Sequence, residues 1–207
     1  VRTLADHAAR GAHDAGGDRL LQAERITDRH DGLPDLDRGG VAVPQLTAEV
    51  LLAHAIRVER VWLFAHPEQE LEEVQWLHYG RYLHERLGGK PTQYITKKQE
   101  FYGREFRVTP DVLIPRPETE HVVEVALQVA RGARRVLDVG TGSGALAATL
   151  NLELRAESWA TDLSPAAARV ASENASRLGA NVGVVVCDLM MAIAPGSVDL
   201  IVSNPPY

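Results

Sequence analysis

Apolar residues recur at helical spacing in the part of the chain that follows residue 40. Leu46, Val50 and Ala53 stand three or four positions apart, which is the period of a helix with one apolar face. A second helix is predicted over about residues 72–87, and it is expected to stop at Gly88. Helices of this length, close together in the chain, predict a small helical domain.

The pattern changes to an alternation of apolar and polar residues over 101–108. This alternation runs around Gly103 and predicts a β-hairpin, which residues 112–114 are expected to extend. Pro115 then ends the strand, and Pro117 suits the first turn of a helix that runs to about Ala130.

Beyond residue 130, apolar strands alternate with helices. Strands are predicted at 135–139, 158–161, 182–187 and 198–202, and helices at 145–154 and 165–179. This rhythm predicts a parallel sheet with helices on its faces, an α/β fold.

The same patterns divide the chain into four segments. Residues 27–40 are rich in glycine, proline and aspartate and show no period, and glycines weaken a short helix at 4–25, so residues 1–40 are expected to form an irregular leader or extension. The remaining segments are a helical domain at 41–89, a β-hairpin linker at 90–114 and an α/β domain at 115–207.

Composition and charge narrow the class of protein. The 207 residues carry a formal net charge of −6, which argues against a protein that coats nucleic acid through bulk charge. No apolar stretch approaches the roughly 18 residues of a membrane span, and no apolar signal core opens the chain. The 8 histidines show no ligand spacing, so no metal site is expected. We therefore expect a cytoplasmic protein that does not contact a membrane.

A glycine-rich turn joins the strand at 135–139 to its helix. Gly140, Gly142 and Gly144, with Thr141 and Ser143 between them, allow backbone N–H groups to approach a ligand closely. The same spacing satisfies the dinucleotide fingerprint, so the turn alone does not identify its ligand.

Acidic residues stand at the ends of three successive predicted strands. Asp138 can face a cationic amino-acid group, Asp162 can accept from two ribose hydroxyls, and Asp188 can accept from an adenine amino group. Each one alone is more simply a cap or turn residue. Together at one sheet edge they favour a positively charged nucleoside, namely S-adenosylmethionine.

The last four residues are Asn204, Pro205, Pro206 and Tyr207, directly after an apolar strand. The prolines stiffen the loop and leave the Asn204 side-chain oxygen and the Pro205 carbonyl as acceptors for both hydrogens of a planar –NH₂ group. Tyr207 can stack on that group and face a sulfonium cation. A simple turn after a strand is the alternative.

Such a loop suits methyl transfer to nitrogen. An amide or exocyclic amine nitrogen is a poor nucleophile, because its lone pair is delocalised. Fixing both N–H groups aims the lone pair at the methyl carbon, so the gain comes mainly from orientation. No titratable side chain adjoins Asn204 in sequence, and water is expected to take the proton.

These motifs resemble known methyltransferases. VLDVGTGSG, Asp162 and NPPY together resemble class I methyltransferases that act on planar nitrogens. VLIPRPETE at 112–120, GGKPTQYITKKQEFYG at 88–103 and the helical stretch at 48–71 closely resemble the HemK/PrmC family. That resemblance implies methylation of the glutamine amide in the Gly-Gly-Gln motif of peptide-chain release factors, and so a part in translation termination.

The resemblance also implies roles for individual positions. The residues at 140–144, Asp162 and Asp188 would bind S-adenosylmethionine, and those at 204–207 would hold the target amide. Phe101, Arg116 and Glu118 would line the site.

The hairpin region adds two further expectations. A basic cluster of Lys90, Lys97, Lys98, Arg104 and Arg107 either faces an acidic partner or is a solvated surface. Lys97 stands where members of the family commonly have glycine.

Members of the family continue past NPPY, so the sheet is expected to be incomplete at its C-terminal end. We expect a monomer that contacts release factors and does not bind nucleic acid directly. Three alternatives remain at this point: an adenine-N6 nucleic-acid methyltransferase, an NAD-dependent oxidoreductase, and an inactive truncated fragment.

Overall fold

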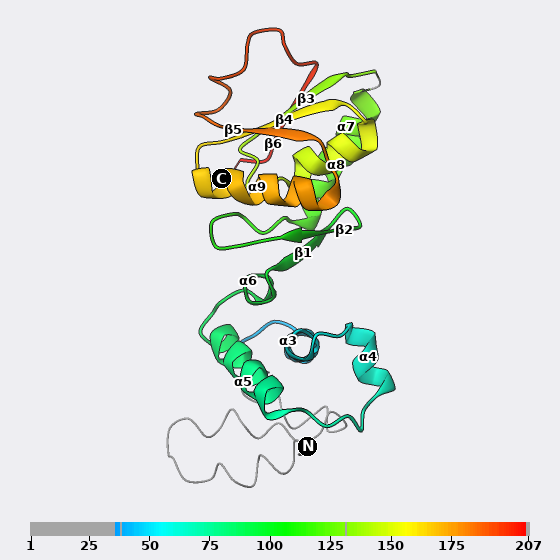
Figure 1. Cartoon of the computed structure of the whole chain (residues 1–207), viewed down its shortest axis with the longest axis vertical. Coiled ribbons are helices and arrows are strands. Elements are labelled where there is room, and N and C mark those ends of the chain that lie inside the picture. The colour runs from blue at the N-terminus through cyan, green and yellow to red at the C-terminus, as the bar shows by residue number, and fades with distance from the viewer. Residues whose placement is uncertain (1–35, 38, 131, 206–207) are drawn as a thin grey trace. The chain divides into compact units, whose positions relative to one another are not determined.

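The computed structural model describes residues 36–37, 39–130 and 132–205. The chain divides into two units, Val1–Thr96 and Lys97–Tyr207, shown in Figure 1. The prediction of an irregular leader at 1–40 lies almost wholly outside the described residues.

The described part of the first unit from residue 44 onward consists mainly of helices, as its sequence pattern predicts. They are α3 (Pro44–Ile56), α4 (Arg60–Ala65), α5 (Glu73–Leu87) and α6 (Thr92–Thr96). Helix α5 begins with a capping box, in which Glu72 and Gln75 each bond the other's backbone N–H. The unit includes α6, which the sequence pattern assigned to the linker.

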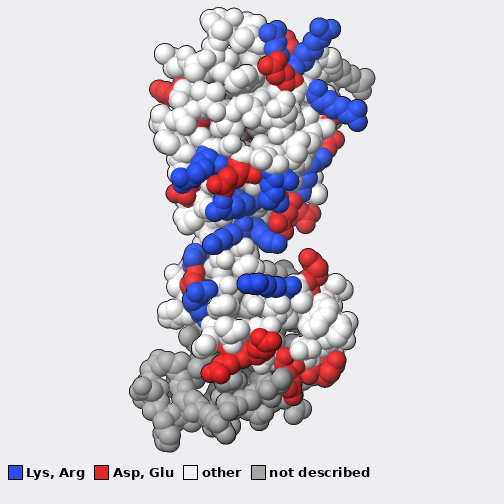
Figure 2. All heavy atoms as spheres, viewed as in Figure 1, with Lys and Arg blue, Asp and Glu red and all other residues white. Residues whose placement is uncertain are grey.

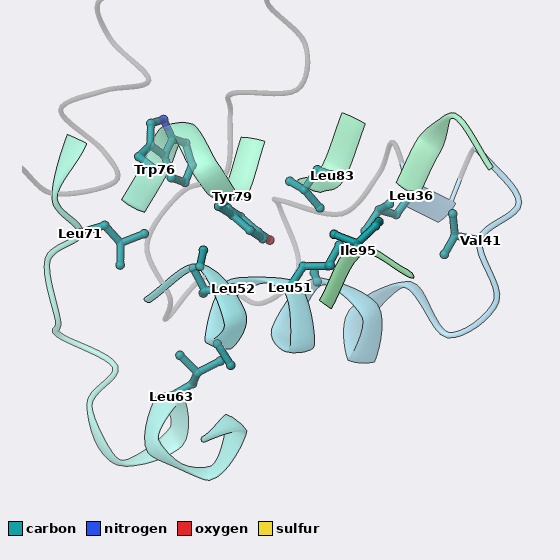
Figure 3. Packing of buried hydrophobic residues seen from close by; sticks show 13 residues of the cluster. Leu36, Val41, Leu51, Leu52, Leu63, Leu71, Trp76, Tyr79, Leu83 and Ile95 are labelled. Atoms are coloured by element: carbon teal, nitrogen blue, oxygen red, sulfur yellow. The ribbon is translucent and has the colours of Figure 1, made fainter. Parts of the chain in front are cut away.

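One apolar core holds these helices together. Figure 3 shows Leu51 and Leu52 of α3 on one side of this core and Tyr79 and Leu83 of α5 on the other. Leu36 packs in the same core, ahead of the boundary predicted at residue 41. The unit therefore draws on residues on both sides of that boundary.

The second unit opens with an antiparallel hairpin of β1 (Lys98–Phe101) and β2 (Arg104–Arg107). Tyr102 and Gly103 form its turn with φ of 50° and 68°. Two positive φ values in a two-residue loop are typical of a type I′ turn, whose twist matches that of the strands.

The predicted extension of the hairpin over 112–114 is wrong. The Val112 N–H donates to the Thr109 carbonyl, and the Thr109 hydroxyl donates to the Asp111 carboxylate at 3.0 Å. This local turn uses the backbone donor that a strand pairing would need.

The rest of the unit is the predicted parallel sheet. Its strands are β3 (Arg135–Val139), β4 (Glu157–Asp162), β5 (Val182–Val186) and β6 (Leu200–Ser203), in the order β5-β4-β3-β6. Helices α7 (Glu120–Val129), α8 (Ala145–Leu154) and α9 (Pro165–Leu178) pack against it, and a short 3₁₀ helix, η2 (Pro117–Thr119), precedes α7. The prediction of an α/β, Rossmann-like fold is confirmed.

Local sequence explains the ends of these elements. The Ser164 hydroxyl caps α9 by accepting from the Ala167 N–H at 3.3 Å, Pro165 follows at the first helical position, and Gly179 ends the helix at φ 71°. Strand β6 is held beside β3 at its start, because the Asp199 carboxylate accepts from the N–H groups of Arg134 and Arg135 at 2.9 Å each. Among the described helices, none has both the length and the apolarity needed to cross a bilayer.

Candidate cofactor and acceptor site

The carboxyl ends of the four parallel strands meet at one edge of the sheet. Val139 of β3 lies opposite Thr161 of β4 on one side and Ser203 of β6 on the other. Asp162 ends β4 beside Val186 of β5. Ligands of open α/β sheets bind outside this edge, where the strand order changes direction.

The glycine turn is held at this edge by backbone bonds. The N–H groups of Gly140 and Thr141 both donate to the Thr161 carbonyl at 2.9 Å. The Gly144 N–H donates to the Thr141 carbonyl, also at 2.9 Å, as α8 begins. One carbonyl at the end of β4 therefore sets the start of the turn.

The glycines of the turn face different surroundings. Gly140 and Gly142 have φ of 71° and 54°, and a Cβ atom at either would meet nothing within 4 Å. Gly144 has φ 80°, and a Cβ there would lie 3.0 Å from the Cα of Ala171 in α9. The first two keep space open beside the turn, whereas Gly144 allows α8 and α9 to pack closely.

Asp138 lies beneath the turn with only 1% of its surface exposed. One carboxylate oxygen, Oδ2, accepts from the Thr141 hydroxyl at 2.7 Å and the Ala147 N–H at 3.2 Å. The other, Oδ1, is buried without a hydrogen-bond partner. Desolvation raises the pKa of Asp138 to about 6, and the two hydrogen bonds oppose that shift.

Asp162 and Asp188 differ in how far the fold engages them. The Asp162 carboxylate accepts from the N–H groups of Gly142 and Ser164 at 2.9 Å each. Each of its oxygens retains a lone pair that a hydroxyl can donate to. Asp188 lies exposed two residues after β5 ends.

The loop predicted to hold the acceptor amide, residues 204–207, begins after β6 at the same edge. We call it the acceptor loop. The Ser203 hydroxyl donates to the Val139 carbonyl at 2.7 Å, and the Asn204 side-chain amide donates to the Thr119 hydroxyl at 3.0 Å. Pro205 is exposed. Pro206 and Tyr207 lie outside the described residues, so their predicted roles stay predictions.

Three other residues, Phe101, Arg116 and Glu118, are expected from the resemblance to line the site. Arg116, just before η2, and Glu118, within η2, are both exposed. Phe101 is 1% exposed and its ring packs edge-on against Phe106, with centroids 6.1 Å apart. The structure thus puts Phe101 in the core of the second unit and not on a surface.

The basic cluster of the hairpin region is largely neutralised within each unit. Ion pairs join Lys90 to Glu85, Lys98 to Glu105, Arg104 to Glu153 and Arg107 to Glu173. Figure 2 shows blue and red side chains interleaved in the band around β1 and β2. Among the described residues, this arrangement favours a solvated surface over a bare basic patch.

Two residues to which the sequence motifs assign no role support the site. Asn174 of α9 is 0% exposed, and its amide donates to the carbonyls of Arg107 and Ser143 at 2.8 and 2.9 Å. Thr119 is 8% exposed and accepts from Asn204. The sequence does carry a signal for Asn174: an asparagine among the alanines on the buried face of α9 indicates a side chain with hydrogen-bond partners in the core.

Comparison with known proteins adds family information. Residues 30–96 match a family model for the PrmC N-terminal domain, and residues 120–207 match one for a methyltransferase small domain. The chain is 49% identical over 179 residues to the release factor glutamine methyltransferase of Koribacter versatilis, covering 84% of this chain and 64% of that protein. Proteins of the same name from Bordetella pertussis and Bacillus subtilis are each 46% identical over 169 residues.

The Bordetella match covers 80% of this chain and 63% of that protein, and the Bacillus match covers 77% and 59%. This chain therefore spans about three fifths of the length of these relatives. Among solved structures, a methyltransferase from Pyrococcus furiosus has a TM-score of 0.45 at 24% identity, covering 56% of this chain and 58% of that one.

Proposed function

We propose that this chain, which matches the PrmC N-terminal and methyltransferase small domains, methylates the glutamine of the Gly-Gly-Gln motif in peptide-chain release factors. The methyl donor is S-adenosylmethionine, and the acceptor is the side-chain amide nitrogen. The release factor is the partner, and nucleic acid is not.

One observation carries this proposal: the acceptor loop begins beside the cofactor turn. Strands β3 and β6 are neighbours, with Val139 opposite Ser203. The next residues along the two strands are Gly140 and Asn204. A methyl donor at the glycine turn and an amide held by Asn204 therefore meet at one sheet edge.

The residues at this edge fit S-adenosylmethionine. Space is open beside Gly140 and Gly142, where backbone can approach a ligand. The unpartnered Oδ1 of Asp138 is a buried acceptor that an ammonium group would satisfy. Asp162 and Asp188 supply further acceptors for the ribose and the adenine amine.

The bound cofactor supplies an electrophilic methyl group on a sulfonium, which leaves as a neutral thioether. The protein orients the acceptor. In this proposal, Asn204 Oδ1 and the Pro205 carbonyl accept the two hydrogens of the glutamine amide, which holds its nitrogen lone pair on the line of attack. After the N–C bond forms, the nitrogen gives one proton to water, so the charges balance.

The decisive experiment is methyl transfer with labelled cofactor. We expect the protein to label a release factor and to leave unlabelled a variant whose Gly-Gly-Gln glutamine is replaced by alanine. Equal labelling of that variant would refute glutamine as the acceptor. Labelling of DNA or RNA in parallel reactions would favour adenine instead.

A binding measurement separates the proposal from an oxidoreductase. S-Adenosylhomocysteine is expected to raise the thermal midpoint of unfolding, and NAD is expected to leave it unchanged. The matched control is Asn204→Ala, which should bind S-adenosylhomocysteine as the parent protein does but lose most of its methyl transfer, because the cofactor-binding residues are unchanged and the acceptor for the amide is gone.

A further inference from the structure

The side chain of Asn204 is hydrogen-bonded to a residue that lies far from it in the sequence of the second unit. Its Nδ2 donates to Oγ1 of Thr119 at 3.0 Å, across 85 positions of the chain. Thr119 lies within the VLIPRPETE motif, but the resemblance assigns roles only to its neighbours Arg116 and Glu118.

We propose that Thr119 is a positioning residue for methyl transfer, which fixes the side-chain amide of Asn204 so that Oδ1 faces the substrate. This inference rests on the proposed function, because it assigns Asn204 to the acceptor amide. Thr119 itself does not touch the substrate.

Thr119 is a rigid support. It ends η2, its side chain is 8% exposed, and its N–H donates to the Arg116 carbonyl at 3.0 Å. Pro117 begins the same short helix with a fixed φ. A hydroxyl in this setting has little freedom to follow a movement of Asn204.

The hydrogen bond matters because an asparagine amide has two different ends. When Nδ2 donates to Thr119, Oδ1 is turned away from Thr119 and has no partner among the described residues. If the amide rotated by half a turn, a donor would face the N–H groups of the glutamine and repel them. In this structure the Thr119 hydroxyl accepts from Nδ2, which leaves the oxygen, the end that recognises an –NH₂ group, to the substrate.

The neighbouring contact fixes the backbone in the same way. Ser203 ties the end of β6 to the Val139 carbonyl at 2.7 Å, one residue before the glycine turn. Ser203 therefore sets where the loop starts, and Thr119 sets how the first loop side chain points. Methyl transfer depends steeply on such alignment.

The test compares Thr119→Val, which keeps the shape but loses the hydroxyl, with Thr119→Ser, which keeps the hydroxyl. We expect Thr119→Val to lower kcat for release-factor methylation about tenfold or more, with KM and the affinity for S-adenosylhomocysteine within about twofold of the parent. Thr119→Ser should restore most of kcat. The matched control is Thr149→Val in α8, which removes a buried hydroxyl that has no hydrogen-bond partner.

A double variant shows whether Thr119 acts through Asn204. On an Asn204→Ala background, Thr119→Val should cause no further loss of kcat, because the side chain it positions is already gone. An unchanged kcat in the single variant, or an equal loss on both backgrounds, would overturn the inference.

A spectroscopic readout is independent of activity. In ¹⁵N-labelled protein, the side-chain amide signal of Asn204, identified by its absence in Asn204→Ala, should shift in Thr119→Val and not in Thr149→Val. If the parent protein fails to methylate release factors, the proposed function fails while this signal still decides the hydrogen bond. An unmoved signal refutes the positioning role.

Discussion

The side-chain amide of Asn174 pairs with the backbone N–H and carbonyl of Arg107, as a residue of one antiparallel strand pairs with its partner. The Asn174 amide donates to the Arg107 carbonyl at 2.8 Å and accepts from the Arg107 N–H at 2.8 Å. The same amide nitrogen donates to the Ser143 carbonyl of the glycine turn at 2.9 Å. One buried side chain of α9 therefore joins the hairpin to the glycine turn.

We expect Asn174→Ala to lower both stability and cofactor affinity. It leaves backbone groups of Arg107 and Ser143 without partners, at a cost of roughly 3 kcal/mol in the free energy of unfolding. The freed Ser143 carbonyl loosens the turn, and we expect about tenfold weaker binding of S-adenosylhomocysteine. Urea unfolding and calorimetric titration measure the two effects.

The control for this variant is Asn151→Ala. Asn151 makes the same paired contact with the backbone of Asn181, at 2.9 and 3.0 Å, but it has no contact with the glycine turn. It should lose stability, by about 1 kcal/mol because it is less buried, and retain cofactor affinity. Equal weakening of binding in both variants would contradict a specific link from Asn174 to the turn.

The second prediction concerns pH and Asp138. Burial raises its pKa in the folded protein to about 6 from a reference value of 3.8, so the folded state holds this proton more tightly than the unfolded state. Its contribution to stability is complete below the reference value and is lost as pH rises through about 6. The loss amounts to about 3 kcal/mol.

Asp138→Asn tests this dependence, since its amide keeps an acceptor for Thr141 and Ala147 and carries no charge. Its free energy of unfolding relative to the parent should rise by about 2–3 kcal/mol between about pH 4.5 and 7.5. A difference that stays constant over this range would show that Asp138 does not titrate there.

The third prediction compares the effects of substituting two glycines of the glycine turn, Gly142 and Gly144. Gly144→Ala places a methyl group 3.0 Å from the Ala171 Cα at a φ of 80°, so we expect a loss of about 3 kcal/mol. Gly142→Ala meets open space and should cost about 1 kcal/mol from its positive φ. Its methyl group projects where a ligand approaches, so cofactor affinity should fall out of proportion to stability. A Gly142→Ala variant with parental affinity would place the ligand elsewhere.

The fourth prediction is a stabilising change in the hairpin. Lys97 has φ 61°, a left-handed conformation that glycine adopts without strain. Lys97→Gly should therefore raise the free energy of unfolding by about 1 kcal/mol. The adjacent Lys98→Gly is the control: it lies in β1 and pairs with Glu105 at 2.9 Å, so the same substitution there should lower stability. Destabilisation by both would show that the Lys97 side chain matters more than its backbone.

The sequence was most informative where the governing chemistry is local. Ser164, Pro165 and Gly179 bound α9 because a cap, a ring and a missing Cβ act within a few residues. Likewise, the glycine that the resemblance led us to expect at position 97 suits the positive φ found there, which glycine adopts without strain. Strand–helix alternation was enough to predict the parallel sheet.

The missed features depend on contacts between distant residues. Thr119 meets Asn204 across 85 positions, and Asn174 meets Arg107 across 67. Two basic residues of the hairpin, Arg104 and Arg107, pair with acids on α8 and α9, Glu153 and Glu173. Residue spacing carries no information about such partners until the strand order is known.

The strand order also determines when the site comes into being. Because β6 pairs with β3 and not with β5, the glycine turn and Asn204 are brought together by strand contacts that span 64 positions of the chain. Closing so long a loop costs entropy before any contact repays it, so this pairing is expected to form late in folding. During synthesis, β3 and β4 can enclose the glycine turn while Asn204 has not yet been made. Under the proposed function, the growing chain thus acquires the residues that would hold a methyl donor before it acquires Asn204, which would present the acceptor.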